Sequence, residues 1–153
     1  MREVVQVTNT GFDTFDRSIQ TSLKWIDDVN KEMGREDRGH GYAAMRAVLH
    51  TLRDRLTVEQ STHLAAQLPM MLRGMFYDGW NPSEMPVKIR DREKFMDYIR
   101  DQLGDVSNEI PADQALNAVL TTLQRHVSPG QLEDIQLMMP EELQHLWAEK
   151  MAV

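Results

Sequence analysis

Residues 47–76 read AVLHTLRDRLTVEQSTHLAAQLPMMLRGMF, and residues 118–147 read AVLTTLQRHVSPGQLEDIQLMMPEELQHLW. An offset of 71 aligns these two segments without a gap. Identical residues occupy eight positions of the first segment: Ala47, Val48, Leu49, Thr51, Leu52, Gln60, Pro69 and Leu72. The chain therefore contains an internal repeat, which determines the fold class but identifies no function.

The region that precedes each segment is also duplicated, at an offset of 70. Its matching apolar and glycine residues are Trp25 with Phe95, Ile26 with Met96, Val29 with Ile99, Met33 with Leu103, and Gly34 with Gly104. In both copies apolar residues recur every three or four positions, as on one face of a helix. The face of the first helix comprises Phe12, Phe15, Ile19, Leu23, Ile26 and Met33.

The ends of the helices are marked at equivalent places in the two copies. Thr57 with Gln60 is a capping box, and Ser128 with Gln131 repeats it. Pro69 is expected to begin a further short helix, as is its counterpart Pro140, because the residue before a proline is disfavoured in the helical region. Each copy is thus predicted to contain two longer and two shorter helices.

The predicted fold is all-α, a helical bundle made of two tandem four-helix repeats related by a pseudo-two-fold axis. Repeat one spans residues 12–77 and repeat two spans residues 91–150, with a linker at residues 78–90. Residues 1–11 lack a periodic pattern and are predicted to form a flexible arm. Each repeat alone is near the size at which a core is marginal, so residues 12–153 are expected to form a single duplicated domain.

Composition limits the classes of function. The 153 residues carry a net charge of −7, which argues against general binding to nucleic acid or to an anionic membrane. There is no cysteine, so disulfides, thiol nucleophiles and thiolate metal sites are excluded. The N-terminal residues lack the apolar core of a signal peptide, and no stretch of roughly 18 apolar residues occurs. A cytoplasmic location is therefore expected.

Several runs of the sequence resemble one protein family. They are FDRSIQTSLKWIDDVNKEMG, YAAMRAVLHTLRDRLTVEQSTHLAAQLPMMLRGMFYDGW, VKIRDREKF and HVSPGQLEDIQLMMPEEL, in that order. Over residues 12–147 the chain resembles the bacterial family called domain of unknown function 2267. The resemblance implies an all-helical duplicated bundle of bacterial origin, and it implies no activity, cofactor or catalytic residue.

Residues that differ between the repeats are the candidates for a functional site, since shared residues are most simply structural. Arg46, His50 and Arg53 lie on one helix face, and their counterparts are neutral, as is the counterpart of Arg73. This cluster is predicted to receive a carboxylate or phosphate group of a small ligand. The alternative is a solvated face with ion pairs to Asp54, Glu59 or the acidic second half of the chain.

Metal and catalytic sites are not expected. A di-metal carboxylate site needs two Glu-x-x-His pairs, and Glu142 with His145 has no equivalent pair at Met71 and Gly74. No serine lies in a G-x-S-x-G context, and the glycine-containing run GREDRGHG lacks the G-K-[ST] ending of a phosphate loop. The chain is therefore predicted to use no cofactor or metal and not to be an enzyme.

A partner surface is predicted from the apolar differences between the repeats. Met70 and Met71 align with Glu141 and Glu142, so the first repeat has apolar residues where the second has charge. Trp80 in the linker is a further candidate, although it is also expected to fill the seam between the repeats. The leading hypothesis is a non-catalytic module that binds a protein partner or itself, and the alternative is a small-ligand or anion-binding protein.

Overall fold

The structure, a computed structural model, describes residues 9–144, which form a bundle of helices with no strand among them. The all-α prediction is confirmed. None of the helices in this part of the chain is both long and apolar enough to cross a membrane. The α-helices are α1 (Asp13–Met33), α2 (Arg38–Arg55), α3 (Val58–Ala66), α4 (Met70–Tyr77), α5 (Arg92–Leu103), α6 (Ala112–His126) and α7 (Pro129–Met138). The 3₁₀ helices are η2 (Pro82–Glu84) and η3 (Gly104–Asn108), and residues 141–144 are helical.

The predicted helix boundaries are found in the structure. The hydroxyl of Thr57 accepts a hydrogen bond from the Gln60 N–H, and the Gln60 side chain accepts one from the Thr57 N–H. Ser128 accepts a hydrogen bond from the Gln131 N–H at the start of α7. The reciprocal bond of the predicted second capping box is replaced, because the Ser128 N–H donates to the side chain of Gln67 at 2.7 Å. Pro69 directly precedes α4. These contacts satisfy N–H groups that have no partner within the helix.

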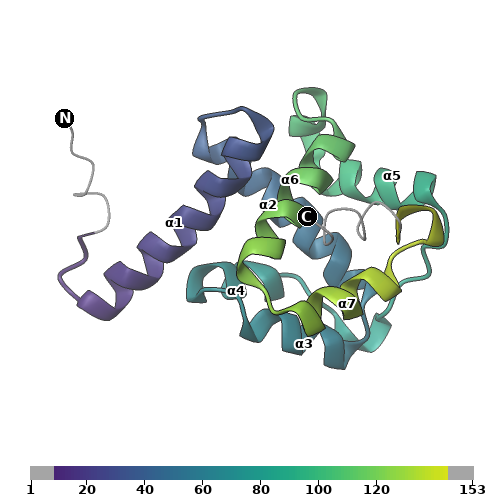
Figure 1. Ribbon diagram of the computed structural model, residues 1–153, viewed down its shortest axis with the longest axis horizontal. Coiled ribbons are helices and arrows are strands. Elements are labelled where there is room, and N and C mark those ends of the chain that lie inside the picture. Colours follow the sequence, from purple (N-terminus) through teal and green to yellow (C-terminus); the bar gives the residue numbers. More distant parts are fainter. Residues whose placement is uncertain (1–8, 145–153) are drawn as a thin grey trace.

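Helix α2 lies in the middle of the bundle and packs against α1, α4, α5 and α6 (Figure 1). Its partners come from both predicted repeats, and so do the residues of the hydrophobic cluster that the described part of the chain buries. Val48, Phe76, Phe95 and Val119 are fully buried in that cluster. The predicted repeats therefore share one core.

The C-terminal half of α1 is attached to α6 by aromatic and charged contacts. The Trp25 ring stacks on His126, with ring centroids 4.4 Å apart, and His126 Nε2 lies 3.0 Å from the Asp28 carboxylate. Arg125 forms an ion pair with Glu32 one turn further along α1. These contacts hold this half of the helix against the second part of the chain.

The N-terminal half of α1 projects from the body of the bundle (Figure 1). Phe12 is 53% exposed and Phe15 is 51% exposed, whereas Val29, on the other half of the helix, is fully buried. The apolar face predicted for this helix is therefore covered over only part of its length. The exposed part, together with α4, forms the surface described below.

Candidate functional site

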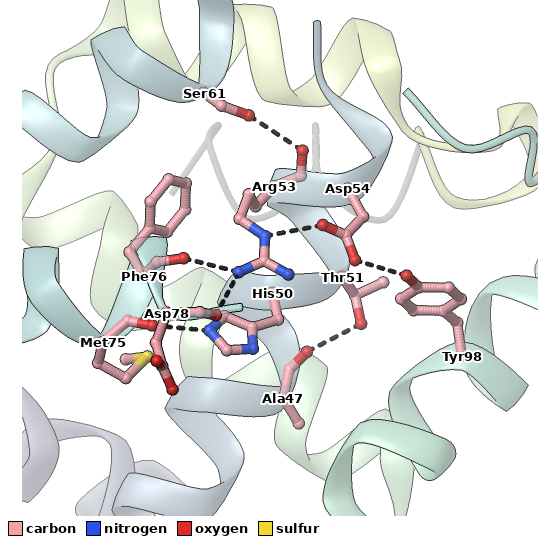
Figure 2. A network of polar contacts seen from close by, with 10 residues as sticks. All are labelled: Ala47, His50, Thr51, Arg53, Asp54, Ser61, Met75, Phe76, Asp78 and Tyr98. Atoms are coloured by element: carbon pink, nitrogen blue, oxygen red, sulfur yellow. Dashed lines mark hydrogen bonds and ion pairs between the residues drawn. The ribbon is translucent and has the colours of Figure 1, made fainter. Parts of the chain in front are cut away.

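Arg53, a predicted anion ligand, is buried and directed at the C-terminal end of α4 (Figure 2). Its Nη1 donates hydrogen bonds to the carbonyl oxygens of Phe76, at 2.9 Å, and Asp78, at 3.0 Å. Its Nε donates to the Asp54 carboxylate at 2.7 Å. The last carbonyls of a helix have no partner within it, so Arg53 satisfies these groups where water is excluded.

His50 makes an equivalent contact one turn earlier along α2. Its Nε2 lies 2.7 Å from the carbonyl oxygen of Met75, which assigns the proton to this nitrogen (Figure 2). Burial lowers the pKa of His50 below the ordinary histidine value, an effect that the bond to Met75 opposes and the charges of Arg53 and Arg46 reinforce. His50 therefore acts as a neutral hydrogen-bond donor to α4.

The network extends from α2 to α5, α3 and the linker. The Tyr98 hydroxyl donates to the second oxygen of Asp54 at 2.5 Å, and burial together with this bond raises the pKa of Tyr98. Ser61 donates to the carbonyl oxygen of Arg53 at 3.0 Å, and the Val87 N–H donates to that of Asp54 at 2.7 Å. Because Arg53 and Asp54 are both paired and hydrogen-bonded, neither charge is left uncompensated in the interior.

Arg73 has a related role at a different helix end. Its Nε and Nη2 donate to the carbonyl oxygens of Ala65, at 3.0 Å, and Leu68, at 2.9 Å, where α3 ends. Arg46 is half-buried, one turn before His50 on α2, and has no hydrogen bond or ion pair with another residue of the described part of the chain.

The structure thus brings together only part of the predicted anion cluster. His50 and Arg53 meet at the end of α4, whereas Arg73 lies at the end of α3 and Arg46 is separate. His50 is 2% exposed and Arg53 is 4% exposed, so the alternative of a solvated face is wrong for these two residues. The predicted ion pair of Arg53 with Asp54 is present, but it is buried. The partners that sequence analysis missed are backbone carbonyls, which leave no signal in the sequence.

These contacts support α4, which has only eight residues. A helix of this length is marginal by itself in water. Its last carbonyls are held by His50 and Arg53, and Arg73 joins its first turns to the end of α3. His50, Arg53 and Arg73 therefore position α4 and the methionines on it.

An apolar groove runs between α1 and α4, and we call it the α1–α4 groove. Its first hollow, of about 130 Å³, is lined by Phe15, Ser18, Ile19, Met70 and Met71. A second hollow, of about 220 Å³, shares Ile19 and Met71 and continues along α1 and α4 to the side chain of Tyr42 on α2; its further lining residues include Ser22, Leu23, Ile26, Leu72 and Met75. Among the described residues, no charged side chain lines either hollow.

The predicted partner residues Met70 and Met71 lie on the exposed side of this groove. Met70 is 50% exposed and Met71 is 56% exposed, so neither fills the core. Sequence analysis did not identify Phe15, Ile19 and Tyr42 as part of the same surface. A signal for the first two was present, since α5 begins at Arg92, the counterpart of Ser22 on α1, and residues 13–21 therefore have no α-helical counterpart.

Glu142 is the residue of the second aligned segment that corresponds to Met71 in the groove. Its carboxylate accepts a hydrogen bond from the Arg92 N–H, at 3.0 Å, where α5 begins. A carboxylate at the N-terminus of a helix is favourable because it satisfies a free N–H and opposes the positive end of the helix dipole. The counterparts of these two residues in repeat one are Met71 and Ser22, which line the second hollow together.

Trp80 is the remaining predicted site residue. It is half-buried and packs on Tyr77, with ring centroids 5.4 Å apart, and it does not line the α1–α4 groove. Within residues 9–144 no group of three or more histidine and acidic side chains is placed to hold a metal ion. The Glu-x-x-His spacing of Glu142 and His145, from which no metal site was expected, lies partly outside the described residues, because His145 is not among them.

Comparison with known proteins places this chain in a family. The family described as uncharacterized conserved protein (DUF2267) matches residues 23–146, and the chain belongs to it. The matched part begins at Leu23, so the projecting first half of α1, with Phe15 and Ile19, precedes it. No curated protein matches the sequence. The family confirms the resemblance noted from the sequence and assigns no activity.

Proposed function

We propose that this chain is a non-catalytic helical module that binds a protein partner through the α1–α4 groove. The observation that carries the proposal is the position of Met70 and Met71, which are half-exposed beside hollows with apolar linings. A contiguous apolar patch on a protein surface is typical of an interaction site. Methionine side chains adapt to a partner's shape, and a groove between two helices suits a further helix.

The anion-binding alternative has less support from the contacts. His50, Arg53 and Arg73 already donate to backbone carbonyls, so an anion would have to displace bonds that hold α4 in place. Arg46 is the member of the cluster without such a bond. We expect thermal-shift screening with phosphates and carboxylates to show no saturable stabilisation. A stabilisation that Arg46→Ala or Arg53→Ala abolishes would favour the anion site instead.

The groove is tested by comparing two charge substitutions at exposed apolar residues. Met71→Glu places a charge in the groove, and Leu137→Glu places one on α7, where the side chain is 64% exposed. We expect tagged Met71→Glu to lose partners that the wild-type chain captures from lysate of its source cells, and Leu137→Glu to retain them. Identical partner lists for the three proteins would contradict the proposal.

We further propose the finer description of the fold, two tandem four-helix repeats about a pseudo-two-fold axis. The reciprocal packing of α1 on α6 and of α5 on α2 supports it, because α1 aligns with α5 and α2 with α6. Thr57 and Ser128 support it as well, since each accepts a hydrogen bond from the N–H three residues further along. A bacterial source and a cytoplasmic location are part of the same proposal, and neither affects the argument about the groove.

A further inference from the structure

We infer that the α1–α4 groove binds the projecting half of α1 from a second molecule of this chain. The two molecules pair through antiparallel α1 helices, with a two-fold axis at Ile19. This inference rests on the proposed function, since it uses the same groove, and it names the partner. Three features of the described residues support it: the spacing of the apolar residues, the shape of the surface and the distribution of charge.

The apolar residues of α1 are spaced symmetrically about Ile19. They are Phe12, Phe15, Ile19, Leu23 and Ile26, with successive steps of three, four, four and three residues. Steps of three and four keep these side chains on one face of the helix. A two-fold axis at Ile19 therefore places Phe15 opposite Leu23 of the second molecule, and Phe12 opposite Ile26. The row of apolar residues on α1 can therefore pair with the same row of a second molecule that runs antiparallel to it.

The surface also has protruding and hollow parts side by side. Phe12 and Phe15 are half-exposed, with their rings 5.0 Å apart in an edge-to-face pair. Leu23 is half-buried and Ile26 is buried, and both line the larger hollow of about 220 Å³. A two-fold interface needs both shapes on each molecule, because every contact occurs twice. The aromatic pair of one molecule fits the larger hollow of the other.

The positions of the charged residues also favour antiparallel pairing of the two α1 helices. The first turn of α1 is acidic, with Asp13 and Asp16. Arg46 lies one turn after Tyr42, which lines the larger hollow, and this half-buried cation has no hydrogen bond or ion pair within residues 9–144. Antiparallel pairing brings the acidic turn of the second molecule toward this hollow. The pair thus supplies Arg46 with a carboxylate partner.

The experiment uses the absence of cysteine in the sequence. A residue on a two-fold axis meets its own copy, so Ile19→Cys provides one thiol per molecule that is able to form a symmetric disulfide. The matched control is Thr21→Cys, which is exposed, two residues along, and on the opposite side of α1. Under mild oxidation, we expect Ile19→Cys to form the covalent dimer at least about tenfold faster than Thr21→Cys.

Sedimentation of the unmodified chain provides a second readout that does not depend on the cysteine variants. We expect a dimer at roughly 100 μM, a concentration at which a pair with a micromolar Kd is almost fully associated. Arg46→Glu is expected to raise the dimer Kd about tenfold, and Arg46→Glu combined with Asp16→Arg is expected to recover most of that loss. Leu137→Glu should leave the Kd unchanged.

A monomer at this concentration, with equal cross-linking of Ile19→Cys and Thr21→Cys, would overturn the second molecule as the occupant. If Met71→Glu then still loses a captured partner that Leu137→Glu retains, the groove binds a different protein and the proposed function stands. If neither variant alters capture, the proposed function fails as well.

Discussion

Two corners of the molecule, one where α1 meets α4 and one where α5 meets residues 141–144, are formed by segments that align in the sequence but differ in their contacts. In the second corner α5 begins at Arg92, and the carboxylate of Glu142 caps its first turn. In the first corner α1 continues outward through residues 13–21, and Met71 occupies the position of Glu142. The corner at α5 is thus occupied by a capping carboxylate, whereas the corner at α1 is an open apolar groove.

The helices that form these corners are also held differently. In repeat one, His50 and Arg53 reach from α2 to the carbonyls at the end of α4. In repeat two, the counterpart of His50 is Thr121, whose hydroxyl donates to the Asn117 carbonyl oxygen within its own helix. His50 and Arg53 are therefore found where a short helix forms one wall of the groove. Residues that resemble an anion-binding site in the sequence therefore hold the helix that forms one wall of the α1–α4 groove.

The largest expected effect comes from breaking the buried network of repeat one. We expect Arg53→Met to lower the free energy of unfolding by about 3–5 kcal/mol, because it leaves the buried Asp54 carboxylate without its counter-charge and the carbonyls at the end of α4 without their donor. Denaturant unfolding measures this loss. The matched change in repeat two, Gln124→Met, is expected to cost about 1 kcal/mol or less. Equal losses at both positions would contradict a special role of the network in repeat one.

The next effect is on association and not on stability. We expect Met71→Glu to raise the dimer Kd by at least about tenfold, because it places a charge in an apolar groove. Its free energy of unfolding should change by less than about 0.5 kcal/mol, since the side chain is 56% exposed. Sedimentation and denaturant unfolding measure the two quantities. A large loss of stability without a change in Kd would show that Met71 has a structural role.

A smaller effect is expected at the corresponding residue of repeat two. Glu142→Ala removes the carboxylate that caps the Arg92 N–H, and we expect it to lower the free energy of unfolding by about 0.5–1 kcal/mol. The dimer Kd should not change. Sedimentation and unfolding of this variant, beside Met71→Glu, therefore separate capping from binding, and a weakened dimer would remove the distinction between the two corners.

The smallest effect is the pH dependence due to His50. Its pKa is lowered in the folded protein, so the unfolded chain takes up the proton at a higher pH. The stability that His50 contributes is fully present above about pH 6.5, the ordinary histidine value, and is lost as the pH falls toward the lowered value. His50→Gln keeps a donor for the Met75 carbonyl but does not titrate. We expect it to flatten the pH dependence of unfolding below about pH 6.5, and an unchanged slope would contradict this role.

Much of the fold was predictable because its determinants are local. The period of the apolar residues, the capping box at Thr57 and the proline at position 69 act within one or two helical turns, and the structure has helices with the predicted starts at these residues. The repeat indicated that Met70 and Met71 differ from their charged counterparts, and the structure leaves both residues exposed.

The exposed part of α1 and the buried network around Arg53 were not predictable, because they depend on contacts between residues far apart in the sequence. Periodicity shows which face of α1 is apolar, but not that the face is uncovered at Phe12 and Phe15, since this depends on where α6 ends against it. A row of cations on a helix normally indicates a solvated face, and the burial of Arg53 requires carbonyl partners 23 and 25 residues away. The bond between Tyr98 and Asp54 spans 44 residues and follows from no motif.

The most direct test of the groove uses the methyl groups of the methionines in an NMR dilution series. With ¹³C-methyl methionine and spectra from roughly 10 to 500 μM, a range over which dilution dissociates a dimer with a Kd of roughly 10 μM, we expect concentration-dependent shifts at Met70 and Met71, which are exposed in the groove. The buried Met45 and Met139 should not shift. Shifts at neither groove methionine across this range, or equal shifts at the buried ones, would contradict the pairing of two molecules through the α1–α4 groove.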